Sequence, residues 1–291
     1  MEYPGTVNEL ANGLRQDGYL ADRGLATALL VSLSLHQPVL LEGEVGVGKT
    51  EVAKVLASSY GRKLIRLQCY EGIDANQALY EWDYARQMLA IRALSDRQAT
   101  DEQAVDKLFG PKFLVRRPLL EAIELGDQAV LLIDEVDRAD DEFEAFLLEV
   151  LSDFQISIPE IGTITAESRP TVILTSNRTR ELHDALRRRC LYHWIGYPTA
   201  EREVEIVLVR EPAAAELLTK KVVSAVHRLR ELDLAKPPGV AETIDWVRTL
   251  GFLGETELTT QAADDTLGAV IKDRDDLDLV RENLAEITSG A

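Results

Sequence analysis

Residues 43 to 50 read Gly-Glu-Val-Gly-Val-Gly-Lys-Thr and directly follow the apolar run 38–41. The glycines leave room for backbone N–H groups to approach phosphate oxygens, and a helix beginning near Lys49 directs the positive end of its dipole at them. Lys49 is expected to reach the β and γ phosphates of ATP, and the Thr50 hydroxyl to bind Mg²⁺. The residues predicted to contact the nucleotide are Gly43, Glu44, Val45, Gly46, Val47, Gly48, Lys49, Thr50 and Glu51.

Two adjacent carboxylates, Asp134 and Glu135, follow the unbroken apolar run 129–133. Such a run is typical of a strand that helices bury on both faces. Asp134 is suited to holding Mg²⁺, directly or through water, and Glu135 to orienting or deprotonating a water that attacks ATP. An Asp-Glu pair after an apolar run can also be a helix N-cap, but the phosphate-binding loop upstream favours the hydrolytic role.

A polar amide, Asn177, lies just past another apolar run, 171–175. At the edge of a neighbouring strand its side chain could hydrogen-bond the γ phosphate or position the attacking water. Ser176 and Thr175 could do similar work, and Asn is also common in turns. Asn177 is therefore predicted as a catalytic residue of the same site.

Three consecutive arginines, Arg187, Arg188 and Arg189, precede Cys190 at the end of a helix expected to start near Glu181. Cations at a helix C-terminus interact favourably with the helix dipole. Alternatively, one arginine crosses a subunit interface and stabilises the negative charge of a neighbour's transferring phosphoryl group. The residues by themselves do not choose among the three.

The elements that would position these residues alternate along the chain. Strands are expected at 38–41, 63–68, 129–133 and 171–175, with helices between them, which predicts an α/β fold whose parallel sheet binds ligand at its carboxyl edge. Two helices are expected within residues 7–36.

Three other segments complete the expected organisation. A charged helical stretch is expected from Ala85 to Leu108, and the segment 155–165 alternates around a Pro159 to Gly162 turn, as a hairpin does. Beyond Pro198 only helical patterns occur. We therefore expect two domains, an α/β nucleotide-binding core over 1–198 that carries the hairpin insert, and a small all-α domain over 199–291.

Composition narrows the classes of partner. The 291 residues carry a formal net charge of −18, which opposes non-specific attraction to nucleic acid or anionic lipid. The two cysteines, Cys69 and Cys190, have no Cys-x-x-Cys spacing, which suits a reducing compartment. No uninterrupted apolar run reaches about 18 residues, so no membrane insertion is expected. A soluble, cytoplasmic protein is predicted.

Taken together, these motifs resemble a known family. Gly43 to Thr50, Leu131 to Glu135 with its continuation Val-Asp-Arg-Ala139, Thr175-Ser-Asn177 and the Arg-Arg-Cys ending look like AAA+ ATPases of the MoxR type. The resemblance covers about residues 16 to 200. Two further stretches, 18–28 and 69–84, resemble the CoxD-like branch, which is associated with maturation of a molybdenum- and copper-containing carbon monoxide dehydrogenase.

The resemblance implies a P-loop parallel sheet flanked by helices, followed by a small helical lid domain. It implies hexameric rings that hold ATP and Mg²⁺ between subunits, a partner with a von Willebrand factor A domain, and a metalloenzyme client. The hairpin at 155–165 matches the family's pre-sensor hairpin. Carried over position by position, the roles are Walker A for Lys49 and Thr50, Walker B for Asp134 and Glu135, sensor 1 for Asn177, and arginine finger for Arg189, with Arg188 second.

One position departs from the family pattern. An arginine often begins a lid helix there and contacts the γ phosphate, whereas this chain reads Pro238-Gly-Val-Ala-Glu-Thr-Ile-Asp-Trp246. Lys236 or Arg248 could substitute only with a different local geometry, so the lid sensor is left unassigned.

The predicted function is an ATP-hydrolysing molecular chaperone that remodels a partner enzyme for metal cofactor assembly or maturation. A nucleic-acid motor or loader is an alternative, which the −18 charge opposes. A nucleotide-gated scaffold with little turnover is another, which the intact Asp134-Glu135 pair opposes. A small-molecule kinase would have no use for Asn177 and the arginine cluster.

Overall fold

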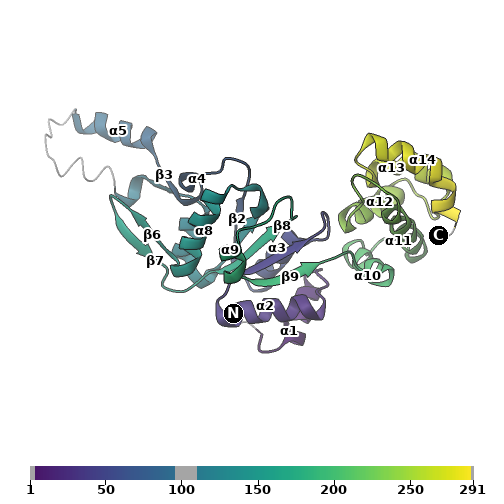
Figure 1. The fold of residues 1–291 in the computed structure, drawn as a ribbon, viewed down its shortest axis with the longest axis horizontal. Helices are drawn as coiled ribbons and strands as arrows, with labels where there is room; N and C mark the ends of the chain where they lie inside the picture. The colour runs from purple at the N-terminus through teal and green to yellow at the C-terminus, as the bar shows by residue number, and fades with distance from the viewer. Residues whose placement is uncertain (1–3, 96–109, 290–291) are drawn as a thin grey trace. The chain divides into compact units, whose positions relative to one another are not determined.

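The structure is a computed structural model that describes residues 4–95 and 110–289. These residues form two compact units, each built from separate stretches of the chain (Figure 1). Unit 1 takes its described residues from Met1–Ala11, Asp22–Glu42 and Ala53–His193, and unit 2 from Asn12–Ala21, Gly43–Val52 and Trp194–Ala291. The predicted domain boundary at residue 198 stays a prediction.

A five-stranded sheet is the centre of unit 1, in the order β2-β5-β8-β1-β9. Its strands are β1 (Val39–Gly43), β2 (Lys63–Gln68), β5 (Ala129–Asp134), β8 (Thr171–Ser176) and β9 (Leu191–Ile195). β2 pairs in parallel with β5, β5 with β8, and β8 with β1. The predicted α/β fold with a parallel sheet flanked by helices is confirmed.

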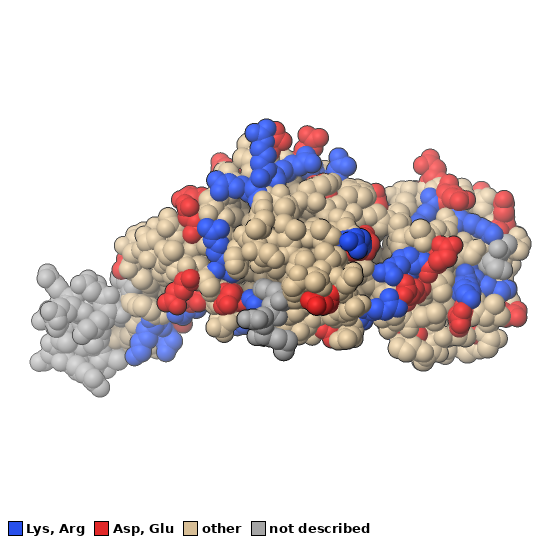
Figure 2. All heavy atoms as spheres, turned by 90° about the horizontal axis from the view of Figure 1, so that it is seen from below, with Lys and Arg blue, Asp and Glu red and all other residues tan. Residues whose placement is uncertain are grey.

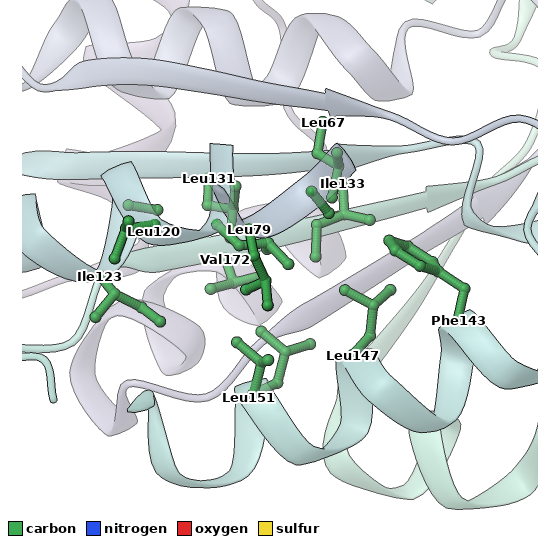
Figure 3. Close-up of a cluster of buried hydrophobic side chains, with 14 of the residues drawn as sticks. Leu67, Leu79, Leu120, Ile123, Leu131, Ile133, Phe143, Leu147, Leu151 and Val172 are labelled. Atoms are coloured by element: carbon green, nitrogen blue, oxygen red, sulfur yellow. The ribbon is translucent and has the colours of Figure 1, made fainter. Parts of the chain in front are cut away.

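Side-chain alternation explains why helices must cover this sheet. All six residues of β5 are buried, and because successive side chains of a strand point to opposite faces, both faces of β5 are covered. On one face, Leu131, Ile133 and Val172 point toward side chains of the helices α4, α7 and α8 (Figure 3). Burying a Leu or Ile side chain stabilises the fold by about 1.5–3 kcal/mol.

The helices up to the last strand of the sheet are α1 (Val7–Gln16), α2 (Arg23–Leu35), α3 (Lys49–Ser59), α4 (Ala75–Leu79), α5 (Tyr84–Ser95), α7 (Pro118–Leu125), α8 (Asp141–Asp153) and α9 (Asp184–Arg189). Side-chain caps begin several of them, since the first N–H groups of a helix lack partners within it. Asp140, for example, accepts the Phe143 N–H at 2.9 Å and begins α8.

Two short antiparallel pairs lie outside the main sheet. β3 (Tyr80–Trp82) pairs with β4 (Leu114–Arg116), and β6 (Gln155–Ile158) pairs with β7 (Gly162–Thr165) as the expected hairpin. The described residues of this part also form the 3-10 turns η2 (Pro111–Phe113), η3 (Gly126–Gln128) and η4 (Val136–Arg138). Of the charged helical stretch expected from Ala85 to Leu108, the part beyond Ser95 lies outside the described residues.

The helical region of unit 2 has its own core. Its helices are α10 (Ala200–Arg210), α11 (Glu216–Glu231), α12 (Val240–Phe252), α13 (Thr260–Val270) and α14 (Arg274–Ser289). Trp246 is fully buried in this core and donates its indole N–H to the Thr266 hydroxyl at 2.7 Å. Glu203 is also fully buried, where it accepts hydrogen bonds from Arg230 at 2.6 and 2.8 Å and from Thr243 at 2.6 Å. A search of the described helices finds none long and apolar enough to cross a membrane.

Candidate functional site

The carboxyl ends of β5 and β8 place three of the predicted site residues, Asp134, Glu135 and Asn177, at one edge of the sheet, whereas the arginines of α9 precede β9. β5 ends at Asp134, β8 ends directly before Asn177, and β1 leads into the glycine-rich loop. β8 lies between the other two, with Leu174 opposite Ile133 on one side and Glu42 opposite Ser176 on the other. Ligands of open parallel sheets bind at this edge.

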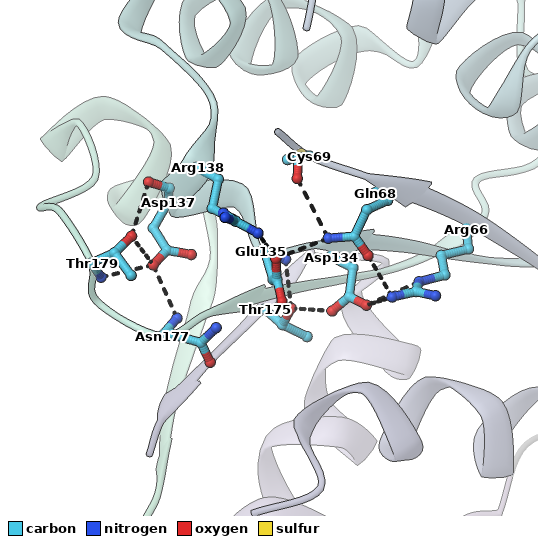
Figure 4. A network of polar contacts seen from close by, with 10 residues as sticks. All are labelled: Arg66, Gln68, Cys69, Asp134, Glu135, Asp137, Arg138, Thr175, Asn177 and Thr179. Atoms are coloured by element: carbon cyan, nitrogen blue, oxygen red, sulfur yellow. Dashed lines mark hydrogen bonds and ion pairs between the residues drawn. The ribbon is translucent and has the colours of Figure 1, made fainter. Parts of the chain in front are cut away.

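Asp134 is almost completely buried, and neighbouring strands hold its carboxylate on two sides. Thr175 of β8 donates its hydroxyl to Oδ1 at 2.5 Å. Arg66 of β2 donates two N–H groups to Oδ2, from Nε at 3.0 Å and from Nη2 at 2.6 Å (Figure 4). The predicted metal ligand thus forms an ion pair with an arginine that was not among the predicted site residues.

Glu135 has a left-handed backbone conformation, with φ 55° and ψ 49°. A non-glycine residue pays about 1–2 kcal/mol for this conformation, so the surrounding contacts must hold it. Its N–H donates to the Thr175 hydroxyl at 2.9 Å, while its Oε2 accepts Gln68 Nε2 at 3.0 Å and Arg138 Nη1 at 3.1 Å (Figure 4). The turn away from β5 therefore orients the side chain that is predicted to activate water.

Asp137, which lies in the Val-Asp-Arg-Ala139 continuation of the Asp-Glu motif, was not among the predicted site residues. Its carboxylate is buried, and Oδ2 accepts the N–H of Asn177 at 3.2 Å, the N–H of Thr179 at 2.8 Å and the Thr179 hydroxyl at 2.7 Å. Oδ1 is buried without a hydrogen-bond partner among the described residues. Asp137 thus fixes the backbone that carries the half-buried Asn177. Its spacing, three residues after Asp134, is a signal that could have pointed to it.

A second buried carboxylate, Glu144 of α8, fixes the chain that leads into α9. It forms an ion pair with Arg180 and accepts the His183 N–H at 2.8 Å. Arg180 Nε also donates to the Ala139 carbonyl at 2.9 Å. His183 then caps α9, so the helix begins at Asp184, later than predicted. The segment between Asn177 and the arginines is therefore tied to the segment that follows Glu135.

The three arginines of α9 are exposed. Arg187 lies over the Tyr192 ring, 5.9 Å from its centroid, and the Arg189 carbonyl accepts Gln37 Nε2 at 3.1 Å. The guanidinium groups of Arg188 and Arg189 form none of the ion pairs found among residues 4–95 and 110–289. The predicted finger position therefore stays a prediction.

The glycine-rich loop belongs to unit 2. Lys49 is buried, and its ammonium donates to the carbonyls of Gly43 at 2.8 Å and of Glu44 at 2.6 Å. A Cβ at Gly43 would lie 2.0 Å from the Ile195 carbonyl oxygen, so only glycine fits there. The loop ends at α3, which begins at Lys49, so the first N–H groups of this helix point at the space that a phosphate would occupy.

The start of α12 packs against this loop within unit 2. Ala241 donates its N–H to the Gly46 carbonyl at 3.2 Å, and a Cβ at Gly239 would lie 2.7 Å from Gly46 Cα. Glu242 caps the helix through the Gly239 N–H at 3.0 Å. An acidic residue therefore occupies the first turn, where the family pattern often has an arginine.

The two basic residues that could substitute at this position, Lys236 and Arg248, have other partners in unit 2. Arg248 pairs with Glu211 and with Asp245, and the Lys236 ammonium lies 3.4 Å from Asp273. Glu51, predicted to contact the nucleotide, pairs with Arg210 of α10 at 2.9 Å. The lid sensor is left unassigned here too.

Both cysteines are buried thiols. Burial first, and then the negative charges of Asp134 and Asp137, together raise the pKa of Cys69 to about 12. Burial also raises the pKa of Cys190 to about 12. Neither thiol is a nucleophile at neutral pH, because only the thiolate reacts.

Comparison with protein families gives one match over half of the chain. The model of the AAA domain, dynein-related subfamily, matches residues 38–190. The match begins just before β1 and ends at Cys190, so it includes the glycine-rich loop, Asp134, Glu135, Asn177 and the three arginines.

Individual relatives are distant. The chain is 21% identical over 225 residues to an uncharacterized protein, SSP1341, of Staphylococcus saprophyticus, covering 75% of this chain and 77% of that protein. Among solved structures, a mutant of RuvB from Thermotoga maritima is similar with a TM-score of 0.52 and 16% identity, over 100% of this chain and 82% of that one. The Thermotoga maritima RuvB Holliday junction branch migration motor gives a TM-score of 0.48 and 16% identity, over 99% and 80% of the two chains.

Proposed function

Because the chain belongs to the AAA domain family, dynein-related subfamily, we propose that it is an ATPase of the AAA+ type. One observation carries the proposal. Three adjacent parallel strands, β1, β8 and β5, end at one edge of the sheet in the glycine-rich loop, in Asn177 and in the Asp134-Glu135 pair. These are the groups that hydrolysis of a nucleoside triphosphate needs: a phosphate cradle, a metal ligand and a base.

In the proposed reaction, the loop N–H groups and Lys49 bind the β and γ phosphates of ATP. Thr50 and Asp134 would hold Mg²⁺, and a hydroxyl with a carboxylate is the oxygen donor set that this ion prefers. When bound, Mg²⁺ neutralises part of the phosphate charge. Glu135 accepts a proton from the attacking water, and Asn177 orients that water or the γ phosphate. ATP and water become ADP and phosphate.

We further propose that the chain is of the MoxR type, in its CoxD-like branch, and forms a ring, hexameric by analogy with that type. Arg189, or else Arg188, would reach the γ phosphate held by the next subunit. Support comes from the exposure of both side chains on α9, since an arginine that acts on a neighbour has to be on the surface. The work of the ring would be to remodel a metalloenzyme client with a partner that carries a von Willebrand factor A domain. A cytoplasmic location, inferred from the cysteine pattern, belongs to the same proposal.

We do not infer branch migration activity for this chain from its similarity to RuvB. At 16% identity, that similarity shows a shared fold alone. The charge of this chain also opposes a nucleic-acid substrate. On the right-hand lobe of Figure 2 acidic side chains lie beside basic ones, and the formal net charge of the chain is −18. A polyanion would find little net attraction there.

A phosphate-release assay on the purified chain tests the proposed activity. We expect steady release of phosphate from ATP that requires Mg²⁺ and is lost in Lys49→Ala. The control Lys54→Ala changes another lysine of α3 and should keep turnover within about twofold. Absence of Mg²⁺-dependent phosphate release from the purified wild-type chain would overturn the proposal.

A further inference from the structure

The ion pair between Arg66 and Asp134 places a cation on the carboxylate that is predicted to face Mg²⁺. Two N–H groups of Arg66 converge on the single oxygen Oδ2, at 3.0 and 2.6 Å. The side chain of Asp134 is 3% exposed, whereas that of Arg66 is 50% exposed. The Asp134 carboxylate is thus inside the protein, whereas half of the Arg66 side chain is exposed to solvent.

Asp134 does not depend on Arg66 for its orientation. It is the last residue of β5, in register with Gln68 of β2, and Thr175 holds its other oxygen Oδ1 at 2.5 Å. A residue that only positioned the carboxylate would therefore duplicate contacts that already exist. What Arg66 adds is positive charge, with both donors on one oxygen.

We propose that Arg66 is a resident counter-cation of Asp134 that competes with the divalent metal and so sets the metal affinity of the site. The inference rests on the proposed ATPase function. A guanidinium on Oδ2 blocks one face of the carboxylate and repels a second cation, so metal binding requires Arg66 to withdraw. When nucleotide and metal are absent, the positive charge of Arg66 compensates the buried negative charge of Asp134. A buried carboxylate without such a partner would destabilise the fold.

Gln68 connects the replacement of Arg66 by the metal at Asp134 to the side chain of Glu135. Arg66 Nη2 donates to Gln68 Oε1, and Gln68 Nε2 donates to Glu135 Oε2 at 3.0 Å (Figure 4). Arg66 thereby fixes which end of the Gln68 amide faces Glu135. When Arg66 withdraws from Asp134, the amide loses the contact that orients it. Arg66 then withdraws as the metal binds, and the contact between Gln68 and Glu135 loosens afterwards, while Arg138 stays on Glu135.

The test compares the affinity of a fluorescent, non-hydrolysable ATP analogue in EDTA with its affinity at saturating Mn²⁺. The ratio of the two dissociation constants measures how much the metal strengthens binding. In Arg66→Met, which keeps the length of the side chain but removes its charge, we expect this ratio to rise by about threefold to tenfold, the size of a partly exposed ion pair. Arg66→Lys keeps the charge but not the paired donors, so its ratio should rise less.

Lys63→Met is the matched control, because Lys63 is also on β2 and pairs with a carboxylate, Glu121, away from the site. Its ratio should equal that of the wild type. If the wild-type ratio shows no effect of Mn²⁺, the proposed function fails. If the wild type responds to Mn²⁺ but both Arg66 variants show an unchanged or smaller ratio, the inference about Arg66 fails alone. Should Arg66→Met not fold, the Arg66→Lys ratio decides in the same way.

Discussion

The Asp137 carboxylate accepts hydrogen bonds from both the backbone N–H and the hydroxyl of Thr179, at 2.8 and 2.7 Å. The same oxygen, Oδ2, also accepts the Asn177 N–H at 3.2 Å, so Asp137 fixes the first residues after β8. The carboxylate itself lies only three residues beyond Asp134. Two segments far apart in the sequence, one with the predicted metal ligand and base and one with the predicted sensor, are therefore held together by one buried side chain.

Asp137→Ala is expected to lower the free energy of unfolding by about 3 kcal/mol, because it leaves three donors without their acceptor. Asp137→Asn keeps one oxygen at this place and should cost less than half as much. Urea denaturation measures both. Asp153→Ala, at the exposed end of α8, is the control and should stay within about 0.5 kcal/mol of wild type. Equal losses for Asp137→Ala and Asp137→Asn would contradict the acceptor role.

Glu135→Gln should bind ATP and hydrolyse it at least about 100-fold more slowly, because an amide cannot accept the proton of the attacking water. Phosphate release gives the rate, and a fluorescent analogue gives the affinity. Glu142→Gln, an exposed position of α8, should leave both unchanged. Near-normal turnover in Glu135→Gln would remove Glu135 from the proposed reaction.

A mixture of Arg189→Ala and Glu135→Gln chains should recover activity that neither variant has alone. In the proposed ring, an intact Glu135 of one subunit faces an intact Arg189 of the next where the two kinds of subunit meet. Phosphate release from the mixture is the measurement. A mixture of Lys49→Ala and Glu135→Gln is the control, since both defects affect the subunit's own site and no intact site can form. If Arg188→Ala rather than Arg189→Ala gives this recovery, Arg188 is the finger.

Arg180→Met should destabilise the chain by about 3 kcal/mol, because the carboxylate of Glu144 is buried and would lose its counter-charge. The double variant Arg180→Met/Glu144→Gln should lose less free energy of unfolding than the two single variants lose in sum. The coupling energy between the two residues should exceed about 1 kcal/mol. Unfolding of the four chains in urea measures this cycle. The same cycle on Arg248 and Glu211, where Arg248 is 60% exposed, should give a coupling below about 0.5 kcal/mol.

The buried thiols give an expectation for alkaline pH. The folded-state pKa values of Cys69 and Cys190 are raised to about 12, above the 9.0 of an unperturbed thiol. Below about pH 9 the stability that each protonated thiol contributes is fully present, and it is lost between about pH 9 and 12, by about 1.4 kcal/mol per pH unit for each thiol. Cys190→Ala should therefore unfold with a flatter dependence on pH than wild type above pH 9.

A thiol reagent checks the same point at pH 8. Neither cysteine should react while the chain is folded, and both should react in denaturant. Rapid labelling of one thiol in the native chain would contradict the burial of that residue. If the free energy of unfolding of Cys190→Ala falls with pH above 9 as steeply as that of wild type, the raised pKa of Cys190 is contradicted.

The central strands could be predicted because each is an apolar run long enough to cross the sheet. Ile133 and Leu174 lie in such runs. Because both faces of these strands are buried, apolar residues follow one another without the polar alternation of a half-exposed strand. β9 was not predicted, since its residues Leu191 to Ile195 alternate between half-buried and exposed at the edge of the sheet. Its Leu-Tyr-His-Trp-Ile pattern of aromatic and apolar residues was the available signal.

The sequence by itself determined the chemistry of the site residues, because glycine spacing, Lys49, Thr50, and paired carboxylates after an apolar run are local patterns with local causes. Only the tertiary structure decided which side chains restrain them. Arg66 and Asp134 are 68 residues apart, and Asp137 and Thr179 are 42 apart. Such pairs depend on strand order and register, which no short stretch of sequence encodes, and the buried partners of a carboxylate become visible only when the strands are side by side.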